Sequence, residues 1–66
     1  MQRIANYTDH NGTKITAQYF GALGIMMILT VDGKDFDSLP VEKRRAMKED
    51  LRDRVNAGSV TFREVP

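Results

Sequence analysis

The chain has 66 residues and no cysteine, and its ten lysine and arginine residues against nine acidic residues give a formal net charge of +1. This length suits one domain, and the absence of cysteine excludes disulfide bridges. The near-balance of charge excludes attraction to nucleic acid or to a membrane by the overall field alone. We therefore expect a single α+β domain over residues 1–66.

The N-terminal residues become polar before any apolar run develops, so the sequence predicts no signal peptide. The uncharged stretch from Ile15 to Val31 is interrupted by polar residues, whereas a membrane-spanning helix needs about 20 mainly apolar residues. We therefore expect no membrane partner. The absence of cysteine fits a reducing compartment, and we expect a cytoplasmic location.

The first turn signal is Asn11-Gly12, a dipeptide typical of type I′ hairpin turns. It predicts a strand from about Arg3 to Thr8 and a second strand from Thr13 to Phe20, in which apolar and polar residues alternate. One face of this second strand should contact solvent. Residues Gly21 to Gly24 then form either a short loop or a glycine bend in one long curved strand.

The segment from Ile25 to Val31 is apolar at both odd and even positions, a pattern typical of a strand that is covered on both faces. Asp32-Gly33 follows it and predicts a second hairpin turn. A short fourth strand is therefore expected near Lys34 to Phe36.

A helix is predicted from Leu39 to Ala57. Ser38 offers an N-cap hydroxyl, Pro40 suits the first helical turn, and Gly58 suits the position that follows the helix. A last strand is expected from Ser59 to Val65. At about 100° per residue, the helix places Pro40, Met47, Leu51 and Val55 on one stripe, with Arg44 among them.

The predicted order of elements is β-β-β-β-α-β. This order favours a small antiparallel sheet of four to five strands with one amphipathic helix packed on one face. The alternative is an SH3-like, partly open barrel with a helix before the last strand.

A single helix covers one face of a sheet only, so the second face of the apolar strand needs another cover. That face would carry either Ile25, Met27 and Leu29 or Met26 and Ile28. The sequence therefore predicts a site where a protein partner, or a second copy of the chain in a homodimer, binds to the sheet face or edge. The predicted protein-interaction residues are Met26, Met27, Ile28 and Leu29.

Catalytic chemistry has little support in the sequence. His10 is the only histidine and lies in a predicted turn, and Asp32, Asp35 and Asp37 lack the glycine and glutamate spacing of a calcium loop. We expect no catalytic residue, no metal site and no cofactor, and therefore no enzyme activity.

Basic residues on the predicted helix support an alternative function. They could meet phosphate groups in a nucleic acid, although acidic residues are interleaved with them. The candidate nucleic-acid-binding residues are Arg44, Arg45, Lys48 and Arg52. Our leading prediction remains a small, non-enzymatic protein-interaction module, a kind of accessory or inhibitor protein that bacteria and phages encode.

Overall fold

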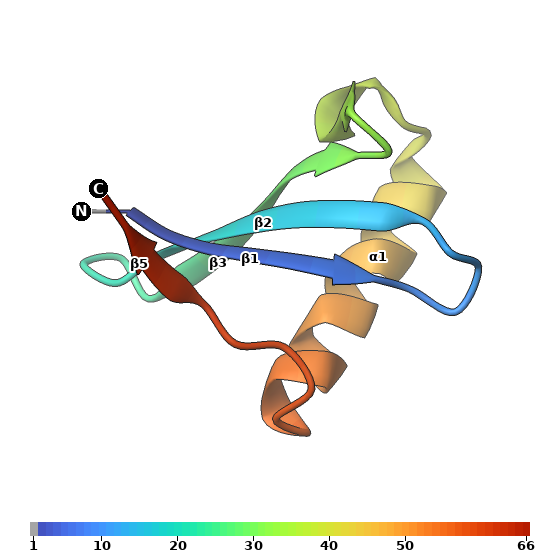
Figure 1. Cartoon of the computed structure of the whole chain (residues 1–66). Helices are drawn as coiled ribbons and strands as arrows, with labels where there is room; N and C mark the ends of the chain where they lie inside the picture. The colour runs from blue at the N-terminus through green and yellow to red at the C-terminus, as the bar shows by residue number, and fades with distance from the viewer. Residues whose placement is uncertain (1) are drawn as a thin grey trace.

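The structure is a computed structural model that describes residues 2–66. Its elements, in chain order, are β1 (Gln2–Thr8), β2 (Lys14–Phe20), β3 (Ile25–Val31), β4 (Lys34–Asp35), the 3₁₀ helix η1 (Phe36–Ser38), α1 (Val41–Asn56) and β5 (Arg63–Val65). The five strands form one antiparallel sheet in the order β4-β3-β2-β1-β5, and α1 packs across one face of it (Figure 1). The edge strands β4 and β5 do not pair with each other, so the sheet is open. The predicted α+β fold is confirmed, and the open sheet, not the barrel, is the form observed.

The core lies between α1 and the sheet because alternate residues of β1, β2 and β3 point toward the helix. The sheet contributes small and β-branched side chains at the centre, and Leu51 is the buried residue of α1. Burying a leucine side chain in this way is worth about 2 kcal/mol. The buried residues are Ala5, Ile15, Ala17, Ile28, Val31, Phe36, Leu51 and Val60.

A β-bulge interrupts β3 next to β2. Ala17 pairs with Ile28 and Thr16 pairs with Thr30, so Leu29 is an extra residue without a partner in β2. The bulge shifts by one residue the alternation of inward-facing and outward-facing side chains along β3. As a result Val31, and not Thr30, is buried in the core.

The two hairpin turns differ in type. In the second turn Asp32 has a φ of 51° and Gly33 a φ of 80°, as the predicted type I′ turn requires. In the first turn Asn11 has a negative φ, and the Gly12 N–H donates to the Asp9 carbonyl at 3.1 Å. The prediction of a type I′ turn is therefore wrong at this position. Asp9 and Thr13 close a loop of residues 10–12, which ends with Gly12 in the left-handed conformation.

The segment from Gly21 to Gly24 forms a short loop between β2 and β3. Its closing hydrogen bond runs from the Gly24 N–H to the Phe20 carbonyl at 2.8 Å. Of the two alternatives that the sequence left open, the short loop is the one observed.

The helix begins later than predicted. The Ser38 hydroxyl does not cap it but donates to the Asp35 carbonyl at 2.6 Å, within η1. Pro40 is the N-cap residue and provides no side-chain hydrogen bond. The reason is that residues 36–38 form their own short turn, which places Phe36 in the core.

The C-terminal end of α1 follows the prediction. Gly58 has a φ of 78°, its N–H donates to the Val55 carbonyl at 3.1 Å, and the Ser59 N–H donates to the Arg54 carbonyl at 2.8 Å. This is the Schellman motif.

The last strand is shorter than predicted. It covers Arg63–Val65 and not the whole segment from Ser59. The residues before it connect the helix layer to the sheet layer, and among them Val60 is buried in the core while Phe62 packs against it.

Candidate protein-interaction site

The predicted interaction residues of β3 lie on two faces of the sheet. Ile28 is buried in the core, and Met26 packs against that core on the helix side. Met27 lies on the opposite face and is 47% exposed, and Ile25 on the same face is 45% exposed. Leu29 is the bulge residue and is half-buried. The most exposed apolar side chains of β3 are therefore Ile25 and Met27, on the uncovered face.

The strand register extends this uncovered face across the sheet. Gln18 separates Met27 from Ile4, and Phe20 pairs with Ile25. We call this surface the open-face patch, and its residues are Ile4, Phe20, Ile25 and Met27. Leu23, in the adjoining β2–β3 loop, is 71% exposed.

Polar residues occupy the other half of the same face. The Thr16 hydroxyl donates to Asn6 Oδ1 at 2.7 Å, and Thr30 lies opposite Thr16 on β3. The open-face patch is thus confined to the end of the sheet that carries the β2–β3 loop, which projects beyond α1 (Figure 1).

The outer backbone edge of β3 is paired with another strand over only part of its length, and η1 also lies close to β3. β4 pairs only with Thr30 and Val31. Between Ile25 and Leu29, the outer edge of β3 therefore faces no strand within residues 2–66. A strand edge of this kind presents N–H and C=O groups that another chain can pair with, and β3 has no charged residue to oppose such pairing.

A hollow of about 310 Å³ lies where this edge meets α1. We call it the edge hollow, and its lining residues are Gly24, Ile25, Met26, Ile28, Lys48, Leu51 and Arg52. It brings together two groups of residues that the sequence assigned to separate functions. Met26 and Ile28 belong to the predicted protein site, whereas Lys48 and Arg52 belong to the predicted nucleic-acid site.

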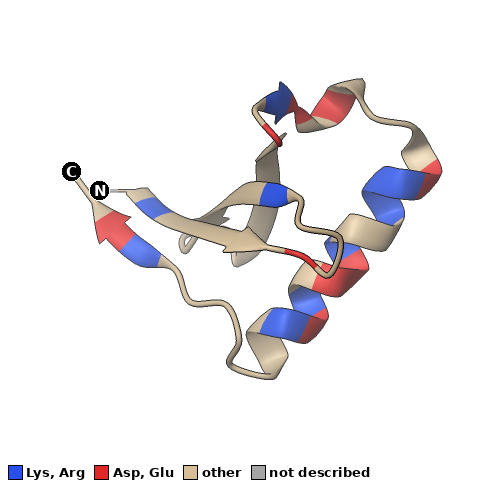
Figure 2. Ribbon diagram, turned by 45° about the vertical axis from the view of Figure 1, so that its right-hand side comes forward, with Lys and Arg blue, Asp and Glu red and all other residues tan. Residues whose placement is uncertain are grey.

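The other two basic candidates do not line the edge hollow. The Arg44 Nε donates to the Leu39 carbonyl at 3.0 Å, which ties this side chain to the chain just before α1. Arg45 is exposed on the helix. Figure 2 shows basic and acidic bands interleaved along α1, so the helix as a whole does not present one basic face.

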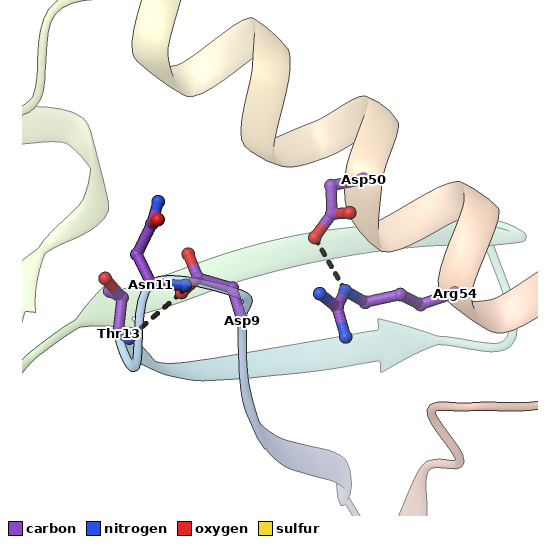
Figure 3. Close-up of polar contacts among 5 residues, drawn as sticks. All are labelled: Asp9, Asn11, Thr13, Asp50 and Arg54. Carbon is purple, nitrogen blue, oxygen red and sulfur yellow. Dashed lines mark hydrogen bonds and ion pairs between the residues drawn. The ribbon is translucent and has the colours of Figure 1, made fainter.

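The opposite flank of α1 carries a structural polar cluster. Arg54 Nε donates to Asp50 Oδ2 at 2.7 Å (Figure 3). The Arg54 guanidinium also lies 5.5 Å from the centroid of the Tyr7 ring. This hydrogen bond to Asp50 raises the pKa of Arg54. Burial, with the nearby Asp50 charge, raises the pKa of Tyr7 to about 12. Tyr7 is therefore neutral near pH 7.

Asp9 organises the first turn beside this cluster. Its Oδ1 accepts the N–H groups of Asn11 and Thr13, each at 2.9 Å (Figure 3). Desolvation acts to raise the pKa of Asp9, but these backbone hydrogen bonds outweigh it and lower the pKa below its usual value. The turn therefore uses Asp9 as a structural acceptor.

A second hollow, of about 530 Å³, was not predicted from the sequence. It lies on the helix side of the sheet, where Tyr19 and Phe62 have ring centroids 5.8 Å apart and Arg3 lies 3.8 Å from Glu64. These residues come from β1, β2 and the C-terminal segment, so only the strand order brings them together. No local motif indicates this arrangement.

Within residues 2–66, no group of three or more histidine, aspartate or glutamate side chains is placed to hold a metal ion. Asp32 instead accepts the Lys14 N–H at 2.9 Å. Among the helices of residues 2–66, none is long and apolar enough to cross a membrane, and α1 is both too short and too polar.

Comparisons of the chain with protein-family models, with curated proteins and with solved structures found no match.

Proposed function

We propose that this protein is a non-enzymatic interaction module that binds a protein through β3. The contact would use the open-face patch, centred on Ile25 and Met27, together with the free edge of the same strand. The main support is that β3 has no charged residue and yet leaves two large apolar side chains about half exposed on the face opposite α1. Exposed apolar surface on a small domain is typical of a binding surface.

The geometry makes this patch suitable for a protein surface. Its side chains stand on neighbouring strands of a hydrogen-bonded sheet, so the backbone that carries them is ordered before binding. A partner would therefore cover apolar area at a low cost in backbone ordering. In this proposal the protein acts in the cytoplasm as an accessory or inhibitor protein of a bacterium or phage, and the partner is another protein or a second copy.

The test compares Met27→Asp with the matched variant Val41→Asp. Val41 is an exposed apolar residue at the start of α1, outside the open-face patch, so it receives the same acidic side chain. Light scattering would measure the mass of the purified protein, and affinity capture from the source cells would identify bound proteins.

We expect a dimer or one captured protein with the wild-type chain and with Val41→Asp, and its loss with Met27→Asp. Circular dichroism should show that both variants remain folded. Equal assembly or capture with Met27→Asp would overturn the proposal, as would a wild-type chain that stays monomeric and captures no protein.

The alternative of nucleic-acid binding would use Arg45, Lys48 and Arg52, which are exposed on α1. Single-stranded nucleic acid also needs aromatic side chains for stacking. Tyr7 lies beneath Arg54 and Tyr19 packs against Phe62, so neither ring forms a platform beside these basic residues. The structure therefore gives this alternative less support than protein binding.

A further inference from the structure

We propose that the free edge of β3 binds an extended, acidic peptide segment of a partner protein as an added antiparallel strand. This inference rests on the proposed protein-binding function and specifies the chemistry of the partner. It combines the unpaired edge from Ile25 to Leu29 with the two basic residues that line the edge hollow, Lys48 and Arg52.

The edge provides the backbone part of the contact. A peptide that pairs with Ile25 to Leu29 would continue the sheet beyond the short strand β4, which ends its pairing at Thr30. In such strand addition, backbone hydrogen bonds supply affinity and alternate side chains supply specificity. Side chains on one face of the added strand would lie above the edge hollow, and those on the other face would lie beside Ile25 and Met27.

Lys48 and Arg52 provide the electrostatic part of the contact with the peptide. Lys48 and Arg52 are exposed, neither forms a salt bridge within residues 2–66, and no carboxylate lines the edge hollow. Arg44, Lys48 and Arg52 are spaced four residues apart, so like charges repel along this side of α1. Acidic side chains on the added strand would relieve this repulsion.

The two faces together define the sequence pattern of the partner. Glutamate or aspartate at alternate positions would meet Lys48 and Arg52 on the helix side. Apolar residues between them would extend the open-face patch at Ile25 and Met27. The edge hollow therefore favours a strand in which acidic and apolar residues alternate.

A second copy of the chain fits this edge less well. Antiparallel pairing of two β3 edges around a two-fold axis would keep both helices on the same face of the joined sheet. Lys48 and Arg52 of one copy would then face the same residues of the other copy. This like-charge contact opposes edge-to-edge pairing, as lysines near sheet edges commonly do.

The probe is a fluorescein-labelled heptapeptide in which valine and glutamate alternate, with both ends blocked, and binding is followed by fluorescence anisotropy. One comparison peptide replaces every glutamate with lysine, and another carries N-methyl groups that block backbone pairing. A thymidine oligonucleotide serves as the nucleic-acid probe. The binding-site variant is Lys48→Glu/Arg52→Glu, and its matched control is Lys43→Glu/Arg63→Glu, which makes the same change in net charge away from the edge hollow.

We expect the glutamate peptide to bind the wild-type chain and the control variant, and to bind Lys48→Glu/Arg52→Glu at least about tenfold more weakly, with the lysine peptide now preferred. The N-methylated peptide should not bind. The proposal is overturned if the lysine peptide binds the wild-type chain equally well, if N-methylation has no effect, if the control loses as much affinity, or if the oligonucleotide binds more tightly than the glutamate peptide.

The Met27→Asp capture experiment separates failure of this inference from failure of the proposed function. A protein that is captured through Met27, while the glutamate peptide fails to bind, would retain the proposed function and reject the acidic strand. Assembly of the wild-type chain through its β3 edges, with no peptide binding, would also reject the acidic strand.

Discussion

Met26 and Met27 are neighbours in β3, yet Met26 packs against the core beneath α1 and Met27 is 47% exposed on the other face of the sheet. The alternation of side chains along a strand produces this separation. It assigns different roles to two residues that the sequence alone cannot distinguish. The structure therefore determines which substitutions in β3 test folding and which test binding.

Substitutions at Ile28 and Met27 should differ strongly in their effect on stability. Ile28 is 4% exposed, so Ile28→Ala should reduce the free energy of unfolding by about 2–4 kcal/mol. Met27→Ala should cost less than about 1 kcal/mol because Met27 is about half exposed and lies outside the core. Urea denaturation followed by circular dichroism measures both. Similar losses of unfolding free energy for the two variants would contradict the placement of Ile28 in the core and Met27 on the open face.

Tyr7→Phe should stabilise the protein. The Tyr7 hydroxyl is buried and has no hydrogen-bond partner within residues 2–66, so its removal should relieve a desolvation cost of about 1 kcal/mol. The ring and its contact with Arg54 remain. Thermal or urea denaturation near pH 7 provides the measurement, and a less stable Tyr7→Phe variant would show that the hydroxyl contributes a favourable contact.

The same residue predicts a dependence on alkaline pH. The pKa of Tyr7 is raised to about 12 in the folded chain, against an ordinary value of 10.0, so folding favours the neutral phenol. This contribution to stability is complete below pH 10 and is lost as the pH rises toward 12. The Tyr7→Phe variant should lack this loss, and the difference in unfolding free energy between the two proteins should widen above pH 10.

Asp9→Ala should destabilise the first hairpin by about 1 kcal/mol, because Oδ1 accepts two backbone N–H groups there. Asp9→Asn keeps an oxygen acceptor and should lose less. The pKa of Asp9 is lowered in the fold, so its stabilisation is present above about pH 4 and is lost as the pH falls through the lowered value. Acid titration of stability should show this loss in the wild-type chain but not in Asp9→Asn.

Much of the fold follows from local patterns. The Asp32-Gly33 turn and the Gly58 helix end were predicted because each needs a positive φ that few residues adopt, and both are confirmed. The error at Ser38 has a tertiary cause. Burial of Phe36 accompanies a separate 3₁₀ turn over Phe36–Ser38, before α1. Capping preferences alone do not predict this turn.

The presence of exposed apolar side chains on β3 was predictable from the sequence, but their arrangement was not. The apolar run of β3 correctly indicated more apolar side chains than the core absorbs, since Ile25 and Met27 remain exposed. The run could not show that Ile28 is core, because the phase of the alternation depends on pairing with β2. The approach of Lys48 and Arg52 to Met26 is likewise a product of packing, since the helix and strand are distant in sequence.

Leu29 is the extra residue of the β3 bulge, and the other residues of β3 keep a regular alternation without it. The residues before it alternate outward and inward from Ile25 to Ile28, and the residues after it resume with Thr30 outward and Val31 inward. Deleting Leu29 would therefore leave every other side chain of β3 on its present face. We expect the deletion variant to fold with the same core, as methyl resonances of Ile28 and Val31 would show. The hydrophobic pattern does not require the extra residue, so its effect is to bend the strand and tilt the half that carries Ile25 and Met27 relative to the rest of the sheet.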